Sequence, residues 1–234
     1  MSTFSLNTQW SSPNVGERRP PHHHVSLLVL HYTEIDLQET LDKFKDPKTE
    51  VSAHYVVSEE GEIFLMVDET RRAWHAGASY WRGIEDVNSA SVGIEIVNPG
   101  DRPYTEPQMV SVMALSQDIV TRHDILPWNI VGHSDVAPSR KIDPGKFFPW
   151  ARLAQNGLGL WPDEESCAQY APLAIDKVPD ALVGIGYSPT SVQDNLKGIL
   201  SAFQLHFQPD FITGEVNPET LRRLSWLLHR IPRA

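Results

Sequence analysis

The hydrophobic and polar positions of the first 155 residues change period along the chain, as expected where strands and helices alternate. Val25 to His31 is a short apolar run rich in valine and leucine, which predicts a buried strand with His31 at its carboxyl end. Ser91 to Val97 alternates polar and apolar residues and predicts a second strand. Asn129 to Gly132 predicts a short strand that leads directly into His133. Two histidines are therefore expected at strand ends.

Two further elements are expected between the first two of these strands. Asp36, with Glu39 three positions later, resembles a capping box and predicts a short helix that reaches about Phe44. Residues 52–58 and 62–67 are separated by a turn with the sequence EEG, which predicts a β-hairpin.

A longer helix is expected before the third strand. Thr105 and Gln108 resemble a capping pair, and the helix should reach about His123. Its apolar face is predicted to contain Met109, Val112, Met113, Leu115, Ile119 and Val120. The order of elements therefore mixes strands and helices within one domain.

The last third of the chain has a different pattern. Residues 157–172 are rich in glycine, proline and acidic residues, which is typical of a linker. Helical patterns follow at 178–185, 192–207 and 218–229, with starts at Ser191 and at Asn217-Pro218. We therefore expect an N-terminal extension (1–24), a main domain (25–156), a linker (157–175) and a small three-helix module (176–234).

Composition excludes several classes of protein. Thirty acidic residues against twenty Lys and Arg give a formal net charge of −10, so the basic surface that drives nucleic-acid binding is not expected. No apolar run approaches the roughly 18–20 residues of a membrane-spanning helix. The single cysteine, Cys167, has no partner within the chain for a disulfide. The first 21 residues lack the charged and apolar regions of a secretory signal.

Candidate metal ligands lie where the predicted strands end. His31 and His133 each follow a strand, and Asp143 lies ten residues after His133 in the segment HSDVAPSRKIDPG. Two imidazoles and one carboxylate at one edge of a sheet are a ligand set typical of catalytic zinc, which keeps its fourth position for water. Taken alone, each histidine has the ordinary alternative of a hydrogen-bonded structural residue.

Hydrolysis at such a site requires a base and a positive group. Glu95 lies inside the apolar strand GIEIV, where a carboxylate is costly without a charged or metal partner. Lys141 lies two residues before Asp143 and thus on the same side of an extended segment. The alternatives are a solvated edge-strand glutamate and a solvated loop lysine.

Five motifs point to a family. They are HYT at His31, SAHYVV at Ser52, AWHAG at Ala73, GIEIVN at Gly93 and GHSDVAPSRKIDPG at Gly132. Together they resemble the zinc-dependent N-acetylmuramoyl-L-alanine amidases of type 2, over about residues 25 to 155. The resemblance implies an α/β (α+β) fold with a mixed sheet flanked by helices, as in peptidoglycan recognition proteins. It also implies one zinc ion held by His31, His133 and Asp143, with Glu95 as acid/base and Lys141 as electrophilic stabiliser. An aspartate as third ligand, where phage amidases and animal recognition proteins have cysteine, implies a bacterial enzyme of cell-wall turnover and recycling.

Other residues in or near these motifs are candidates for contacts with substrate. His54, Trp74, His75 and Arg140 are predicted to line the groove, while His54 and His75 have the alternative of supporting the metal ligands by hydrogen bonds. The segment from Ala202 to Leu224 resembles the helical peptidoglycan-binding module of the periplasmic members of this family.

The predicted activity is hydrolysis of the amide between the lactyl group of N-acetylmuramic acid and L-alanine, in peptidoglycan or muropeptides. A peptidoglycan-binding protein without activity and a zinc peptidase that cuts within the stem peptide are the alternatives. The resemblance implies a periplasmic or cell-wall location. Because the first 21 residues do not resemble a secretory signal, a cytoplasmic location is the alternative. The sequence does not indicate an oligomeric state.

Overall fold

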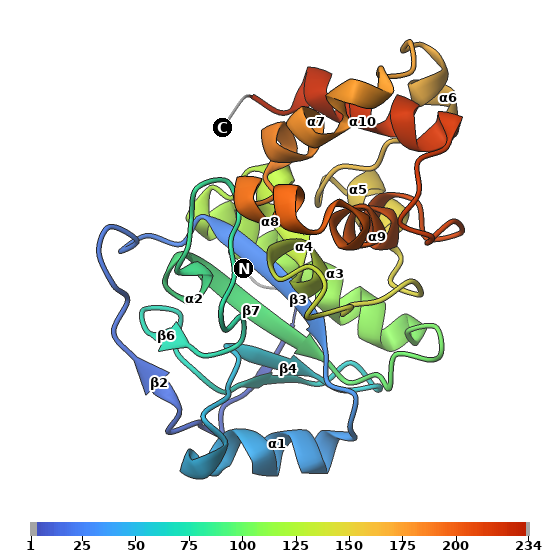
Figure 1. The fold of residues 1–234 in the computed structure, drawn as a ribbon. Coiled ribbons are helices and arrows are strands. Elements are labelled where there is room, and N and C mark those ends of the chain that lie inside the picture. Colours follow the sequence, from blue (N-terminus) through green and yellow to red (C-terminus); the bar gives the residue numbers. More distant parts are fainter. Residues whose placement is uncertain (1–3, 233–234) are drawn as a thin grey trace.

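The computed structural model describes residues 4–232 and contains a six-stranded mixed sheet (Figure 1). The strand order is β1-β5-β4-β7-β3-β8. These strands are β1 (Leu6–Asn7), β3 (Leu27–Tyr32), β4 (Tyr55–Val57), β5 (Ile63–Leu65), β7 (Ser91–Ile96) and β8 (Ile130–Gly132). A two-stranded ribbon pairs β2 (Val15–Gly16) with β6 (Arg72–Ala73). The predicted mixed sheet, and the hairpin formed by β4 and β5, are confirmed.

The parallel strands in the centre of the sheet determine where the candidate site lies. β3 runs between β7 and β8, with His31 opposite Glu95 and Leu30 opposite Gly132. Because both pairings are parallel, the carboxyl ends of the three strands meet at one edge. His31 is the penultimate residue of β3 and His133 follows β8, so residues 102 positions apart in sequence become neighbours.

One face of the sheet is covered by α3 (Glu106–His123). The helix begins at Thr105, whose side chain accepts a hydrogen bond from the amide of Gln108, as predicted. The residues of α3 that are buried against this face are Met109, Val112, Leu115 and Ile119. Met113 and Val120 were expected on the same face and are only half-buried at its margin.

The other face of the sheet packs against the C-terminal helices. Leu27 and Val29 of β3 belong to the same continuous hydrophobic cluster as Leu182, Ile185 and Phe203. These helices are α7 (Val178–Ile185), α8 (Pro189–Asp194), α9 (Leu196–Phe207) and α10 (Pro218–Arg230). The tail and the sheet therefore share one core. Figure 1 shows the tail helices grouped on the side of the sheet where α4 lies.

The tail contains four helices and not the three predicted. The expected helix 192–207 is broken at Asn195, whose backbone is not helical (φ −148°, ψ 64°) and whose side chain accepts a hydrogen bond from Gly198 N–H to begin α9. Ser188, and not Ser191, caps the preceding helix α8, with Pro189 in its first turn. The periodicity of a continuous apolar pattern cannot reveal such a break, because both helices bury the same side.

The remaining helices are short, except for α1. They are α1 (Leu37–Lys45), α2 (Val87–Ala90), α4 (His133–Val136), α5 (Trp150–Gln155) and α6 (Glu164–Ala168). Asp36 caps α1 through the amide of Glu39, as predicted. Single 3-10 turns occur at Pro47–Thr49, Pro127–Asn129 and Ile175–Lys177. Within residues 4–232, no helix has the length and apolar character needed to cross a membrane.

Segments expected outside the main domain also make ordered contacts. In the extension, β1 pairs with β5, and Arg18 is 9% exposed. In the expected linker, α6 buries Cys167 in the same cluster as the tail helices. The proposed boundaries at residues 24, 156 and 175 stay predictions.

Candidate active site and metal centre

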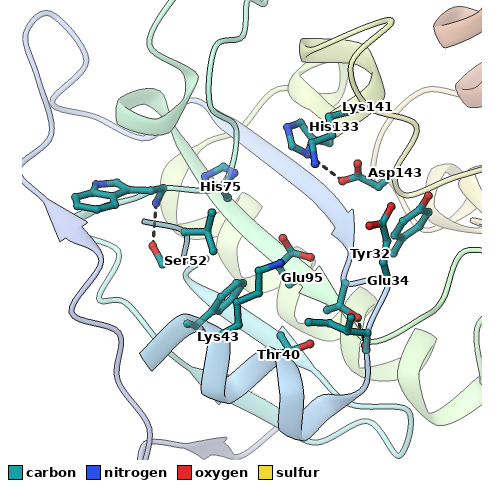
Figure 2. A pocket seen from close by; sticks show the side chains of 15 residues that line it. Tyr32, Glu34, Thr40, Lys43, Ser52, His75, Glu95, His133, Lys141 and Asp143 are labelled. Carbon is teal, nitrogen blue, oxygen red and sulfur yellow. Dashed lines mark hydrogen bonds and ion pairs between the residues drawn. The ribbon is translucent and has the colours of Figure 1, made fainter. Parts of the chain in front are cut away.

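His31, His133 and Asp143 lie together at the carboxyl edge of the central strands. His31 Nδ1 and His133 Nδ1 are 3.0 Å apart, and Asp143 Oδ2 is 3.0 Å from each of them. All three residues are buried. Among residues 4–232, this trio is the group of histidine and acidic side chains placed to hold a metal ion. Figure 2 shows His133 and Asp143 facing one another across the pocket.

The segment after α4 (His133–Val136) folds back and brings Asp143 next to His133. The amide of Ser134 donates to the carbonyl of Asp143 at 2.9 Å, which holds the two segments side by side. Gly132 permits this approach, since a Cβ atom there would lie 2.6 Å from Cδ of Pro144. The ten-residue spacing in the sequence is therefore closed into a single ligand set by backbone contacts.

The hydrogen bonds of His133 direct its lone pair toward the other two donor atoms. Its Nε2 lies 3.2 Å from the carbonyl oxygen of Ala76. Because a carbonyl only accepts, Nε2 carries the ring proton and Nδ1 of the neutral ring holds a lone pair. Two imidazole nitrogens and a carboxylate oxygen in this arrangement suit a divalent metal ion.

The charge states of His31 and Asp143 are also those of metal ligands. Burial, followed by the neighbouring His133, lowers the pKa of His31 to about 4. Burial alone would raise the pKa of Asp143, but hydrogen bonds from His133 and His31 hold it well below its usual range. At neutral pH, His31 is therefore neutral and Asp143 is charged, which metal binding requires.

Glu95 projects from β7 beside the metal-ligand trio. Its Oε1 lies 4.0 Å from His31 Nδ1, and its buried Oε2 has no hydrogen-bond partner. Burial, followed by the charge of Asp143, raises the pKa of the Glu95 carboxyl well above its usual value, while Lys141 and Lys43 oppose this shift. A carboxyl group with a raised pKa next to a metal site is suited to accept and return protons.

The two lysines reach the pocket from different elements. Lys141 is exposed in the loop before Asp143, and its backbone amide donates to the carbonyl of Ala137 at 3.1 Å. Lys43 comes from α1 and extends toward Glu95 (Figure 2). The sequence pattern indicated Lys141 but not Lys43, because an exposed helix lysine carries no signal of its tertiary neighbours.

A pocket of about 130 Å³ opens over this site. The side chains that line it include Tyr32, Glu34, Thr40, Lys43, Trp74, His75, Glu95, His133, Lys141 and Asp143. Burial raises the pKa of Tyr32 to about 12, so its hydroxyl stays protonated and can donate a hydrogen bond. The pocket is thus polar, with both signs of charge on its walls.

The four residues predicted to line the groove have different positions. Trp74 and His75 line the pocket. His54 does not: it is fully buried, its Nδ1 accepts from the amide of Gly93, and its Nε2 lies 3.2 Å from the carbonyl of Arg71. Arg140 is not among the lining residues either. Its guanidinium donates to the carbonyls of Ala76 and Ala78 at 2.7 Å each.

The segment AWHAG contacts both histidine ligands from behind. The ring of His75 lies 3.0 Å from His31, and the carbonyl of Ala76 meets His133. Asn88 anchors this segment, since its Oδ1 accepts from the backbone amides of His75 and Ala76 at 3.0 and 2.8 Å. No pattern in the sequence indicated Asn88, because a single asparagine before a strand is common in loops.

Comparisons with known proteins identify the family to which the chain belongs. Residues 21–146 match the family model for N-acetylmuramoyl-L-alanine amidase, Amidase_2. The chain is 35% identical over 231 residues to N-acetylmuramoyl-L-alanine amidase AmiD of Escherichia coli, which covers 88% of this chain and 83% of that protein.

Solved structures extend the likeness to the tail. The E. coli AmiD complex with the substrate anhydro-N-acetylmuramic acid-L-Ala-D-γ-Glu-L-Lys has a TM-score of 0.81 and 33% identity, over 96% of this chain and 92% of that one. AmpDh3 of Pseudomonas aeruginosa, in complex with anhydromuramic pentapeptide, has a TM-score of 0.81 and 32% identity, over 99% and 100% of the two chains. The chain belongs to the N-acetylmuramoyl-L-alanine amidase family.

Proposed function

We propose that this protein is a zinc-dependent amidase that hydrolyses the bond between the lactyl group of N-acetylmuramic acid and L-alanine in muropeptides. The observation that carries the proposal is the buried trio of His31, His133 and Asp143, with the Glu95 carboxyl 4.0 Å from a ligand atom. A peptidoglycan receptor has no need of such an arrangement beside an open pocket.

The substrate class is supported by the relatives. The E. coli and P. aeruginosa enzymes are bound to anhydromuramic acid carrying three and five stem residues in their respective structures. We therefore propose soluble anhydro-muropeptides as substrate, taken from the cell wall during its turnover. The polar pocket is consistent with a ligand that carries hydroxyl, amide and carboxylate groups.

His31, His133 and Asp143 would hold the zinc ion. Nitrogen and carboxylate donors in a set of three are typical of catalytic zinc. When bound, zinc would supply a Lewis acid that polarises the scissile carbonyl and lowers the pKa of water.

The chain's own residues would carry the proton and stabilise the charge. Glu95 accepts a proton from the attacking water while a new bond forms to the lactyl carbonyl carbon. Lys141 stabilises the negative charge that develops on the carbonyl oxygen. Glu95 then returns the proton to the alanine nitrogen as the carbon–nitrogen bond breaks. Trp74 would line the path of the stem or sugar as a flat apolar surface.

The reaction is tested by incubating the zinc-loaded protein with anhydro-N-acetylmuramic acid tripeptide and identifying the products by mass spectrometry. The expected products are the free sugar acid and an intact stem peptide that begins with L-alanine, and a chelator should abolish their formation. Cleavage within the stem would indicate the peptidase alternative, and binding without cleavage would indicate a receptor.

A single variant tests the role of Glu95. Glu95→Gln preserves the shape of the side chain but cannot accept a proton, so kcat should fall by about 10²–10⁴-fold. Zinc content, measured by elemental analysis, should not change. Wild-type turnover in this variant would remove Glu95 from the mechanism.

The location follows from the substrate as a second proposal. The related enzymes come from bacteria, and we propose the periplasm, where wall fragments are released. Fractionation of the native host with an antibody against this chain tests it, and recovery in the cytoplasmic fraction would indicate a recycling enzyme that acts after import.

A further inference from the structure

A buried row of polar side chains connects the start of β7 to the candidate metal ligand His31. Ser91 Oγ lies 2.6 Å from the carbonyl oxygen of Val87 and 3.1 Å from Nε2 of His75. His75 Nδ1 lies 3.0 Å from Nε2 of His31. Ser91, His75 and His31 are 0%, 8% and 1% exposed, so solvent has little access to these bonds.

Chemistry allows one direction for the protons in this row when both rings are neutral. The carbonyl of Val87 only accepts, so the Ser91 hydroxyl donates to it and presents lone pairs to His75. His75 must therefore donate from Nε2, which leaves a lone pair on its Nδ1. That lone pair accepts from Nε2 of His31.

The consequence reaches the metal-ligand trio. A neutral imidazole has one ring proton, so His31 with its proton on Nε2 has a lone pair on Nδ1. Nδ1 is the atom that lies 3.0 Å from His133 Nδ1 and from Asp143 Oδ2. We propose that Ser91 and His75 are a positioning pair that holds His31 in its metal-binding tautomer. This inference rests on the metal site of the proposed function.

Ser91 and His75 counteract the effect of Asp143 on the tautomer of His31. Without metal, the Asp143 carboxylate can accept a proton from His31 Nδ1, which would favour the other tautomer of His31. In that tautomer Nδ1 has no lone pair for a metal ion. The acceptor on the far side of His31, provided by His75, favours the proton on Nε2 instead.

The ring of His75 is held firmly enough for this role. Asn88 Oδ1 fixes the backbone on both sides through the amides of His75 and Ala76. The ring itself packs on Gly93 of β7, where a Cβ atom would lie 2.6 Å from His75 Cγ. The side chain is thus confined between a glycine and His31.

Two nearly isosteric variants of His75 test the proposal in the full-length protein. Glutamine can accept from His31 with its carbonyl and donate to Ser91 with its amide, whereas methionine fills the space without either bond. Zinc affinity is measured by competition with a chromophoric chelator in the absence of substrate. We expect His75→Gln to stay within about threefold of wild type and His75→Met to bind zinc about 10–100-fold more weakly.

A second variant and a spectroscopic measurement keep the test independent of the fold of the His75 variants. Ser91→Ala should also weaken zinc binding, by about tenfold or more. In the zinc-loaded wild type, ¹⁵N NMR of the imidazoles should place the His75 proton on Nε2. The proposal would be overturned by a proton on His75 Nδ1. It would also be overturned by equal losses of zinc affinity in His75→Gln and His75→Met, or by wild-type zinc affinity in both Ser91→Ala and His75→Met.

These outcomes are distinct from a failure of the proposed reaction. A wild type that binds zinc tightly but releases no stem peptide would overturn the amidase reaction, while the affinity comparison would still decide the role of the pair. A wild type that does not bind zinc would overturn both.

Discussion

His206 of α9 and Asp135 of α4 form a buried pair in which His206 Nδ1 lies 2.7 Å from Asp135 Oδ2. Asp135 also accepts from the amide of Gly132 and from the hydroxyl of Tyr187. Two of its three partners thus come from the C-terminal tail, although Asp135 lies only two residues after the candidate metal ligand His133. The tail therefore helps to hold the segment that carries the site.

Replacement of His206 by alanine should destabilise the whole chain. The change removes one of the hydrogen-bond partners of the buried Asp135 side chain, which typically costs about 1–3 kcal/mol. It also removes the imidazole that stacks on Trp150, with ring centroids 3.7 Å apart. The free energy of unfolding is measured by urea titration. His229→Ala, at an exposed tail histidine whose ring nitrogen is hydrogen-bonded to the carbonyl of Ser225 in its own helix, is the control and should cost much less. Equal losses would contradict the coupling.

The close contact between the end of β8 and Pro144 should not tolerate a side chain at Gly132. In Gly132→Ala the new methyl would lie 2.6 Å from Pro144, so the segment that carries Asp143 must move. We expect a loss of about 1–3 kcal/mol in stability from overpacking. Zinc affinity should fall as well. Gly16→Ala is the control, since its Cβ would meet nothing closer than 3.5 Å. An unchanged zinc affinity in Gly132→Ala would show that Asp143 does not depend on this close contact.

The positive charge of Lys43 should set the acidic limb of activity. Lys43 lowers the pKa of Glu95, so its removal in Lys43→Met should raise that pKa. The base form of Glu95 would then require a higher pH, and the acidic limb of kcat/KM should move upward. Lys48→Met, in the exposed turn after α1, should leave the profile in place. A downward shift in Lys43→Met would contradict the electrostatic role.

Stability in acid should depend on Glu69, far from the catalytic pocket. Burial alone would raise its pKa, but hydrogen bonds from Arg122, His123 and Tyr55 lower the pKa to about 2. A carboxyl whose pKa is depressed on folding stabilises the native state above its unfolded pKa, and the gain is lost as pH falls from about 4.5 toward 2.

The matching variant is Glu69→Gln. It should lose up to about 3 kcal/mol of stability at pH 7 and only a small part of that at pH 2, where about half of the wild-type carboxyl is protonated. Thermal unfolding at both pH values measures the difference. Glu60→Gln, in the exposed hairpin turn, is the control. An equal loss for Glu69→Gln at both pH values would indicate packing and not charge.

Much of the framework was predictable because its signals are local. The cap at Asp36 and the apolar runs that became β3 and β7 depend on residues a few positions apart. The break at Asn195 was missed for the same reason, because periodicity reports which side is buried and not whether one helix or two bury it.

The contacts around the histidines were much less accessible to prediction. His54 shares a motif with the site yet is fully buried and bonded to backbone groups, while Lys43 has no motif and reaches the pocket. Ser91 and Asn88 support the site through hydrogen bonds to His75, which lies 16 and 13 residues away from them in sequence.

The strand and helix pattern and the residue types capable of metal chemistry could be predicted from the sequence, because periodicity, capping and ligand chemistry belong to individual segments. Which atoms meet depends on how these segments pack together. Parallel pairing of β3 with β7 and β8 places His31 beside Glu95 and His133, and packing of the tail fixes Asp135. Hydrogen-bond direction, burial and charge coupling depend on distances between segments, and a linear pattern contains no such distances.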